Sequence, residues 1–285
     1  MAPRKTISVV IAARDSQATI TLAVRSALFA LGPDDEVLVF LDGCTDQTGE
    51  RLSLITDDRL RIFESPRSVG RSAARNKLIA ESRGDYIGVL DSDDVCLPWR
   101  FLVARRYLRN HDAVFSGALL FGQLPFRLPI AFSYPVRLNP SAVRAILSYR
   151  NPLIHSTATF RKDSIPSGQA YEEVPAEEYL LWVKMAIAGK SLLRLRLPTV
   201  GYRLHANQVS ADLDFVAKVA SCPHLKTAKK ELRALQRGRE APYSMPESVS
   251  TKEFLRINKV RTFGVWFEEI FLPNLRNALV STRRK

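Results

Sequence analysis

Three carboxylates, Asp91, Asp93 and Asp94, follow an apolar stretch of the sequence within a single turn. Two carboxylates two residues apart at the end of a strand can reach one divalent cation and the ribose of a nucleotide. Mg²⁺ and Mn²⁺ are hard ions that favour oxygen ligands and complete their shells with phosphate oxygens and water. The alternative is a solvated acidic turn in which one Asp caps the helix that begins near Pro98. The turn alone is therefore a weak indication of a metal and nucleotide site.

A second pair of carboxylates, Glu177 and Glu178, opens a segment that predicts a helix over residues 176–188, with Gly189 as its C-cap. A carboxylate here could remove the proton from an acceptor hydroxyl, which is a poor nucleophile while it keeps that proton. Both carboxylates could equally complement the helix dipole, which favours negative charge at the N-terminus. On the residues alone, both interpretations stay open.

Residues 7–116 alternate strand-like and helix-like segments, which predicts a parallel sheet with helices packed against it. The expected strands cover residues 7–12, 36–41, 60–63, 85–90 and 113–116, and the expected helices cover residues 18–31, 70–82 and 98–109. Polar turns that contain Asp15, Asp42 and Asp91 follow three of these strands. Because ligands in open α/β sheets bind at the carboxyl ends of the strands, these side chains are better placed for a ligand than for a core.

The rest of the chain divides into two regions. Residues 117–175 contain seven prolines and suit a loop-rich region that shapes an acceptor site. Beyond Ser210 the composition becomes helical and basic. We therefore predict a catalytic domain over residues 1–210, with a donor half that ends at residue 116 and an acceptor half that begins at residue 117. A basic helical extension over residues 211–285 would follow.

The composition is that of an ordinary globular protein, since 46% of the 285 residues are hydrophobic and 25% are charged. Cys44, Cys96 and Cys222 are too few and too scattered for a disulfide framework or a zinc site, and they fit a reducing compartment. The apolar run that begins at Ile7 is short and stops at Arg14, which favours a buried strand over a signal peptide. No stretch approaches the roughly 20 apolar residues of a membrane-spanning helix. We expect a cytoplasmic protein.

The net charge of +13 is concentrated near the C-terminus, where residues 226–285 carry 14 Lys/Arg against 6 Asp/Glu, a net +8. Such a tail could favour nucleic acid, an anionic membrane face or solubility. The aromatic segment 261–272 could lie on the inner face of a membrane as a basic helix, or pack back on the catalytic domain. Cations interleaved with stacking aromatic residues, as in nucleic-acid-binding proteins, are not evident, so we expect no nucleic acid partner.

Several blocks carry a family resemblance, in order and with matching spacing: residues 7–15, 37–48, 70–77, 84–94, 176–182 and 202–205. They resemble the family-2 glycosyltransferases of the GT-A fold. The resemblance implies an α/β fold with a mixed, mostly parallel sheet flanked by helices. It also implies a nucleotide-diphosphate sugar donor, a divalent metal, and inversion at the anomeric carbon.

The residues that match the family's motifs by position imply which side chains bind the donor. Asp42 would hydrogen-bond the base and Asp91 would contact the ribose. The base pocket would be lined by Ala12 and Arg14, and the base or diphosphate would lie near Arg71 and Arg75. On the residues alone, Asp42 could be an Asx-turn residue and Arg75 a charge on a helix surface.

The resemblance also implies the metal ligands and the base. Asp93 would bind Mn²⁺ or Mg²⁺, and His205 could ligate the same ion or be structural. Glu178 stands where the family usually has its catalytic Asp, so we nominate it as general base, with Glu177 beside it. Of the remaining histidines, His155 is a candidate for the pocket. We expect His111 and His224 on the surface.

The chain departs from the family pattern at Leu41, Cys44 and Leu180, where the family usually has Asp, Ser and Asp. With these departures, the alternative stays open that the chain is a relative of these enzymes that binds sugar nucleotides without turning them over. The Gln-x-x-Arg-Trp motif of processive polymerising relatives is not found after the acidic helix start. We therefore expect the addition of one sugar to a glycan, a lipid-linked glycan or another hydroxyl acceptor, as in the biosynthesis of cell-envelope polysaccharides.

Overall fold

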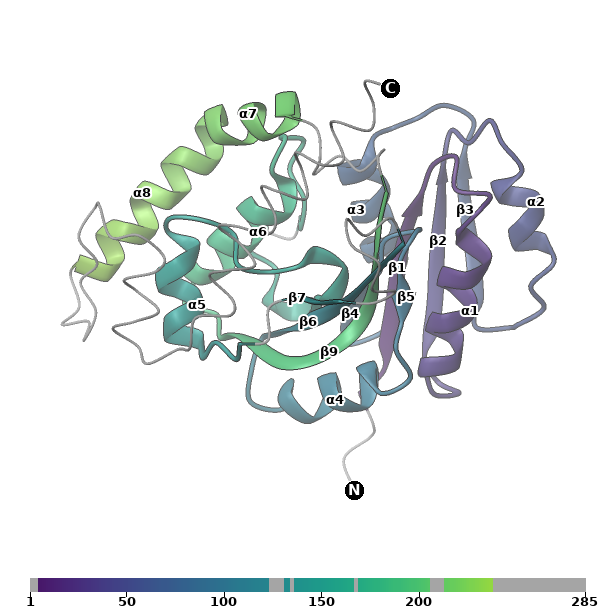
Figure 1. Cartoon of the computed structure of the whole chain (residues 1–285), viewed down its shortest axis with the longest axis horizontal. Helices are drawn as coiled ribbons and strands as arrows, with labels where there is room; N and C mark the ends of the chain where they lie inside the picture. The colour runs from purple at the N-terminus through teal and green to yellow at the C-terminus, as the bar shows by residue number, and fades with distance from the viewer. Residues whose placement is uncertain (1–4, 123–130, 134–135, 167–168, 206–212, 238–285) are drawn as a thin grey trace.

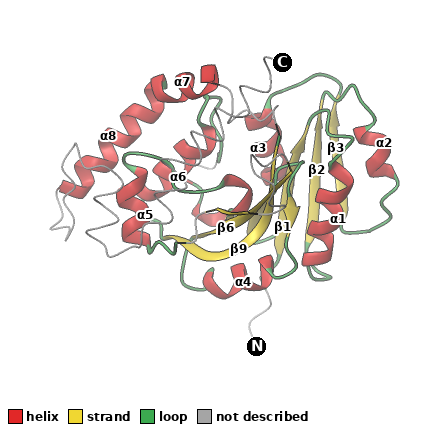
Figure 2. Cartoon of the chain, in the orientation of Figure 1, coloured by secondary structure: helices red, strands yellow, loops and turns green. Residues whose placement is uncertain are grey.

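Helices cover both faces of a mixed sheet in the computed structural model of the chain (Figures 1 and 2). The structure describes residues 5–122, 131–133, 136–166, 169–205 and 213–237. The strands are β1 (Ile7–Ala13), β2 (Glu36–Asp42), β3 (Leu60–Ser65), β4 (Tyr86–Val89), β5 (Val95–Cys96), β6 (Ala113–Gly122), β7 (Ala131–Ser133), β8 (Thr159–Arg161) and β9 (Leu192–Leu204). Within the described residues their order is β3-β2-β1-β4-β8-β6-β9-β5, with β7 paired to β6.

The helices confirm most of the predicted pattern. They are α1 (Ile20–Ala30), α2 (Thr48–Ser53), α3 (Arg71–Glu81), α4 (Arg100–Tyr107), α5 (Pro140–Leu147), α6 (Glu177–Ile187), α7 (Leu213–Ser221) and α8 (Pro223–Arg237), with 3₁₀ turns at His155–Thr157 and Lys162–Ser164. Every strand and helix predicted over residues 7–116 is present. The strand expected to end at Ser116 continues to Gly122 as β6.

The four strands β3, β2, β1 and β4 are parallel and form one half of the sheet. Their side chains alternate between the two faces, as the pleat of a strand requires. Val10 and Leu38 pack in a core with α3 and α6, whereas Val9 and Val37 pack in a second core with α1 and α4. The β-branched runs seen in the sequence are therefore buried on both sides.

The other half of the sheet is mixed and was less predictable. β8 is antiparallel to both β4 and β6, β9 is parallel to β6, and β5 is antiparallel to β9. β9 runs for 13 residues, and only its last three belong to a block that resembles the family. Pro198 in its middle argues against a strand, and it is accommodated where the register shifts opposite Gly117.

The region expected to be rich in loops contains α5. Asn139 caps it, because its side chain accepts a hydrogen bond from the Ala142 N–H (2.8 Å), and Pro140 occupies the first turn. The following helix, α6, is buried through Trp182, whose ring lies 4.8 Å from that of Phe115 between centroids. These two helices therefore support the mixed half of the sheet.

The helix α6 ends as the sequence predicted, and α8 covers it. Gly189 follows it with a φ of +75°, which confirms the predicted glycine C-cap. α8 packs over α6 through Leu225 and Leu232, which are buried in the same core. The segment 261–272 lies outside the described residues, and the proposed domain boundaries stay predictions. In the part of the chain that is described, no helix has the length and hydropathy needed to cross a bilayer.

Candidate active site

The loops that follow β1, β2 and β4 meet at one edge of the sheet, as the strand-end carboxylates predicted. β1 is parallel to both β2 and β4, so the three strands end side by side. Asp15 accepts a hydrogen bond from the Thr45 N–H (2.8 Å), and Ser16 Oγ lies 2.9 Å from Ser92 Oγ. Asp15 has a φ of +46°, a left-handed conformation that Asp tolerates better than most residues. These contacts hold the three loops together as one surface.

Asp42 organises the loop that leads into α3. Its carboxylate accepts hydrogen bonds from Ser68 Oγ (2.9 Å) and from the N–H groups of Val69 (2.6 Å) and Gly70 (3.2 Å). Gly43 has a φ of +63°, and a Cβ there would lie 2.4 Å from the Ser68 nitrogen, so glycine is required for this close approach. Asp42 therefore shapes the rim of the predicted base pocket, and its contact with a base stays a prediction.

Ala12 and Arg14 lie on the strand end next to Asp42. Ala12 is half-buried in β1, in register with Phe40 of β2. Arg14 is exposed, and its Nη1 donates to Ser68 Oγ (3.3 Å), the hydroxyl that in turn donates to Asp42. The structure thus connects two predicted donor residues through Ser68. No motif marks this serine in the sequence, and sequence reasoning missed it.

A chain of alternating charges joins the acidic turn to the start of α6. Arg75 Nη2 donates to Asp91 Oδ1 (3.0 Å), and Arg75 Nη1 donates to Glu177 Oε1 (3.0 Å). Arg71 binds the same Glu177 carboxylate, with 2.5 Å between Arg71 Nε and Oε1. Arg75 and Glu177 are both buried, and a buried charge is tolerated only when it is paired. Arg75 is therefore not a helix-surface charge.

The same contacts set the ionisation of Asp91. Burial raises the pKa of the Asp91 carboxyl, but the neighbouring His155 ring and Arg75 guanidinium lower it, and the net shift is well below the ordinary value. Burial lowers the pKa of Arg75, but the charges around it, Asp91 first, outweigh burial and raise it. Asp91 is thus held as an anion, which suits the hydrogen-bond acceptor role predicted for it.

Glu178 differs from its neighbour Glu177. Within the described residues, no hydrogen bond or ion pair joins its carboxylate to another side chain, whereas both oxygens of Glu177 are bound by arginine. Burial and the charge of Glu177 raise the pKa of Glu178, and the nearby His155 and Arg75 only partly oppose that shift. Glu178 is therefore a carboxylate with an increased tendency to take a proton.

Asp93 and His205 come together from distant parts of the chain, with 2.8 Å between Asp93 Oδ2 and His205 Nε2. Burial and the charge of Asp91 raise the pKa of Asp93, against the effect of His205. Asp94 is buried and accepts the Arg203 N–H through Oδ1 (2.8 Å), while its Oδ2 has no hydrogen-bond partner among the described residues. Crowded carboxylates with raised pKa values and an unsatisfied oxygen fit a hard divalent cation.

A second group of ligand-type side chains lies at the loops after β1 and β2, where Asp15, Cys44 and Asp46 approach one another. Both carboxylates accept backbone N–H groups of neighbouring loop residues, which accounts for their position. A thiol is a soft ligand that does not suit Mg²⁺ or Mn²⁺. Because the carboxylates of this group are already engaged by the backbone, we keep Asp93 and His205 as the predicted metal ligands, and that assignment stays a prediction.

His155, the histidine considered for the pocket, lies beside the acidic turn. Its Nε2 is 2.9 Å from Tyr171 Oη, and its Nδ1 is 3.7 Å from Asp91 Oδ1, beyond hydrogen-bond range. Burial and the charge of Arg75 lower the pKa of His155, and the neighbouring carboxylate of Asp91 only partly opposes that shift. Tyr171, which orients this ring, is a site residue that no sequence signal marked.

The two histidines expected on the surface differ from each other. His224 is exposed, and its Nδ1 lies 2.9 Å from Oε2 of Glu172. His111 is half-buried, and its Nδ1 lies 2.7 Å from Ser191 Oγ. The expectation holds for His224 and only in part for His111, because the turn after α4 packs against the start of β9.

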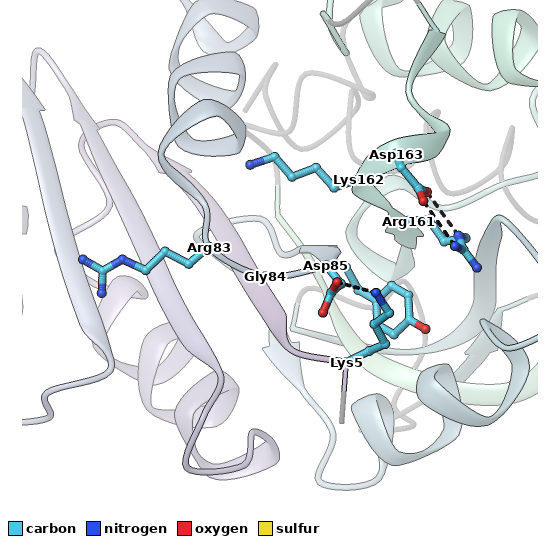
Figure 3. Close-up of a pocket in the computed structure, with 8 residues that line it drawn as sticks. Lys5, Arg83, Gly84, Asp85, Arg161, Lys162 and Asp163 are labelled. Carbon is cyan, nitrogen blue, oxygen red and sulfur yellow. Dashed lines mark hydrogen bonds and ion pairs between the residues drawn. The ribbon is translucent and has the colours of Figure 1, made fainter. Parts of the chain in front are cut away.

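A hollow of about 350 Å³ lies at the opposite end of β4 from the acidic turn (Figure 3). Lys5 pairs with Asp85 (2.7 Å) there, and Arg161 pairs with Asp163 (3.1 Å). Figure 3 shows Arg83 pointing away from the Lys5–Asp85 pair. Two of the four cationic side chains that line this hollow are paired with carboxylates, and the hollow is remote from the strand-end carboxylates, so we do not assign the donor to it.

Comparison with known sequences agrees with this arrangement. The sequence profile described as "Glycosyl transferase family 2" matches residues 8–159. The chain is 27% identical over 206 residues to "UDP-Glc:alpha-D-GlcNAc-diphosphoundecaprenol beta-1,3-glucosyltransferase WfaP" of Escherichia coli, which covers 72% of this chain and 80% of that protein. It is 39% identical over 107 residues to "Succinoglycan biosynthesis protein ExoO" of Rhizobium meliloti, which covers 38% of this chain and 30% of that protein.

Two solved structures share the fold. TarS of S. aureus in complex with UDP-GlcNAc superposes with a TM-score of 0.62 at 16% identity, over 98% of this chain and 92% of that one. The mannosyltransferase PcManGT of Pyrobaculum calidifontis, in complex with GDP-Man and Mn²⁺, superposes with a TM-score of 0.56 at 14% identity, over 100% of this chain and 87% of that one. The profile match covers more than half of the chain, from β1 to β8. The two solved structures share the curled sheet of this chain. The chain therefore belongs to glycosyl transferase family 2 and has the GT-A fold.

Proposed function

We propose that the chain transfers one sugar from a nucleotide-diphosphate sugar to a hydroxyl acceptor, with inversion and with the help of a divalent cation. The observation that carries this proposal is the bridge Asp91–Arg75–Glu177, which ties the predicted donor site to the first turn of α6. The bridge holds the next residue, Glu178, at a set position relative to the donor loops. Transfer to a hydroxyl needs a carboxylate held in this way.

In this proposal Glu178 is the general base. The acceptor hydroxyl gives its proton to the Glu178 carboxylate as its oxygen attacks the anomeric carbon and the bond to the diphosphate breaks. The raised pKa of Glu178 favours that proton transfer. Glu177 was also considered for catalysis, but its two oxygens are occupied by Arg71 and Arg75, so we give it a positioning role.

The donor would lie across the loops at the ends of β1, β2 and β4. Asp42 and Arg14, joined through Ser68, would face the base, and Asp91 would accept hydrogen bonds from the ribose. Arg71 is partly exposed and can reach a diphosphate. Arg75 is buried between two carboxylates, so for this residue we propose a positioning role instead of the donor contact first expected.

Asp93 and His205 would hold the cation, with Mn²⁺ or Mg²⁺ as candidates. Their 2.8 Å approach and the raised pKa of Asp93 support this pairing. When bound, the ion would neutralise the charge that gathers on the diphosphate leaving group. Asp94 accepts the Arg203 N–H and so ties the acidic turn to the end of β9, which keeps the two ligands together.

The relatives narrow the substrate class that we propose. WfaP is named for UDP-Glc and a diphosphoundecaprenol-linked GlcNAc, and the TarS structure holds UDP-GlcNAc. We infer a UDP-sugar as donor and a lipid-linked glycan as acceptor, bound at the half of the chain from residue 117 to 210. An enzyme with such an acceptor would work in the cytoplasm at the inner face of the membrane.

The proposal is tested by replacing Glu178 in the full chain. Glu178→Gln should reduce turnover by roughly 10²-fold or more while donor affinity stays nearly unchanged, because the amide keeps the shape but cannot accept the proton. Release of UDP measures turnover, NMR of the product gives the anomeric configuration, and calorimetry with UDP gives affinity. The control is Glu173→Gln, an exposed carboxylate shortly before α6.

Three results would contradict parts of the proposal. Near-normal turnover of Glu178→Gln would remove Glu178 as base. Retention of the donor's anomeric configuration would exclude inversion. Tight binding of UDP-sugars by the native chain without transfer to any glycan or lipid-linked acceptor would favour the alternative of a binding protein without turnover.

A further inference from the structure

The outer surface of α4 and the adjoining middle part of β9 expose large apolar side chains. Trp99, Leu102 and Leu197 have 40%, 76% and 46% of their surface exposed. Trp99 Nε1 donates to the Pro198 carbonyl (2.8 Å), which joins the two elements and satisfies the polar group of the indole. The exposed part of the ring therefore offers apolar surface to a partner.

Exposed arginines surround these apolar side chains. Arg106 follows Leu102 by four residues, so the two share a side of α4, and Arg109 lies exposed in the turn that follows the helix. Arg196 directly precedes Leu197. In the described part of the chain, none of these arginines takes part in an ion pair or a side-chain hydrogen bond, and α4 contains no acidic residue. The α4 patch comprises Trp99, Leu102, Arg106, Arg109, Arg196 and Leu197.

The α4 patch is connected to the proposed metal pair by short, paired segments. Asp93 lies six residues before Trp99, and His205 lies eight residues after Leu197. Between these points the two segments pair with each other as β5 and β9. A surface that binds the patch would therefore hold the Asp93–His205 pair in a set orientation.

We propose that the α4 patch docks the protein on a membrane that contains anionic phospholipids. Tryptophan and leucine side chains partition into the boundary between headgroups and acyl chains, and arginines next to them bind lipid phosphates. The inference rests on the proposed function in one respect, since a lipid-linked acceptor gives the enzyme a reason to work beside a membrane.

Charge separates this partner from the alternatives. A second copy of the chain carries a net charge of +13, and residues 238–285 carry 9 Lys/Arg against 5 Asp/Glu, a net +4. On net charge, the arginines of the patch disfavour both of these partners. A nucleic acid would match the charge but leave Leu102 and Leu197 without an apolar partner. An anionic lipid surface matches both the cations and the apolar side chains.

The test is flotation of the full chain with vesicles, in the absence of donor and acceptor. The native protein should float with mixed phosphatidylglycerol and phosphatidylcholine vesicles and much less with phosphatidylcholine alone. Leu102→Ser combined with Arg106→Glu should lower the partition coefficient by on the order of tenfold or more, since one cation is lost and one anion is gained near the surface. Transfer to a water-soluble acceptor should be unchanged in this variant.

A matched control exists on α2, which lies at the far side of α1 from α4 in Figure 1. Leu54→Ser combined with Arg51→Glu changes a leucine that is 71% exposed and an exposed arginine, with the same change of net charge. This variant should bind vesicles to within about twofold of the native protein. Equal losses in the two double variants would overturn the proposal, because the effect would then reflect total charge alone.

Fluorescence of Trp99 locates the contact independently. The chain has three tryptophans, so Trp99→Phe gives the signal of the other two. The difference between native and variant protein should shift to shorter wavelength and be quenched by brominated lipid when anionic vesicles are added. Vesicle binding without any change at Trp99, or a change of oligomeric state in the patch variant, would overturn the assignment of this surface to lipid. Because neither measurement needs turnover, failure of the proposed reaction would leave both results interpretable.

Discussion

The carboxylates of the donor loops and the carboxylate that opens α6 have opposite surroundings. Asp42 accepts three hydrogen bonds, and the pKa of Asp91 is lowered beside His155 and Arg75. Glu178 has no such partner among the described residues, and its pKa is raised. A carboxylate is thus kept as an anion where hydrogen-bond donors or cations contact it, and it can accept a proton where such contacts are missing. Four changes test this contrast.

The largest effect is expected at Glu177, which links the two regions. Glu177→Gln leaves Arg71 and Arg75 with less negative charge in a buried site, so the free energy of unfolding should fall by about 3–5 kcal/mol. Urea denaturation measures this loss, with the exposed Glu173→Gln as control. A loss no larger than that of the control would mean that the two regions are not coupled through this residue.

Asp93 tests whether the donor loops bind a cation. Asp93→Asn removes one charged oxygen ligand, so donor affinity should lose most of its dependence on Mn²⁺, roughly a tenfold effect or more. Calorimetric titration with UDP, with and without Mn²⁺, gives the comparison. The matched control is Asp46→Asn in the loops after β1 and β2. If Asp46→Asn abolished the metal response and Asp93→Asn did not, the group around Asp15 would be the metal site instead.

Gly43 tests the packing of the donor loops alone. Gly43→Ala places a Cβ 2.4 Å from the Ser68 nitrogen at a φ of +63°, so unfolding free energy should fall by roughly 1–3 kcal/mol and donor affinity should weaken. Thermal unfolding with and without UDP measures both. Gly49→Ala in α2, where a Cβ meets only Leu41 at 3.4 Å, serves as control and should be close to neutral. Equal behaviour of the two variants would remove the close approach as a requirement.

The pH profile tests the contrast with the smallest change. The base form of Glu178 is lost as the pH falls through its raised pKa, whereas Asp91 stays ionised over that range because its pKa is lowered. The acid limb of kcat/KM should therefore lie above the ordinary Glu value of about 4.3. If the acid limb of kcat/KM lay at or below that ordinary value, the general base would be a group without a raised pKa, and not Glu178.

The donor half was predictable because its signals are local. β-branched runs mark β1 and β2, and a polar turn after each strand places Asp15 and Asp42 at one edge, which the structure confirms. The Asn139–Pro140 pair before α5 is also a local signal, typical of a helix start, that our sequence reasoning did not use. Here the information was present in the sequence.

The rest depends on contacts between distant segments. Arg75 and Glu177 lie 102 residues apart, and no local pattern shows that they share a buried bond. Ser68 and Tyr171 are ordinary polar residues until the fold places one against Asp42 and the other against His155. β9 was obscured because Pro198, taken locally, argues against a strand, and only pairing with β6 reveals how it is accommodated.

The bond between Arg75 and Glu177 also limits how this protein can be recombined with its relatives. A chimera that takes its acceptor half from another enzyme would bring a foreign residue to the position opposite Arg75. Unless that residue is an acid, a buried guanidinium would lose its partner, and the hybrid would fold poorly before its specificity could be measured. Exchange of acceptor preference is therefore best attempted within segments that leave α3 and the first turn of α6 together.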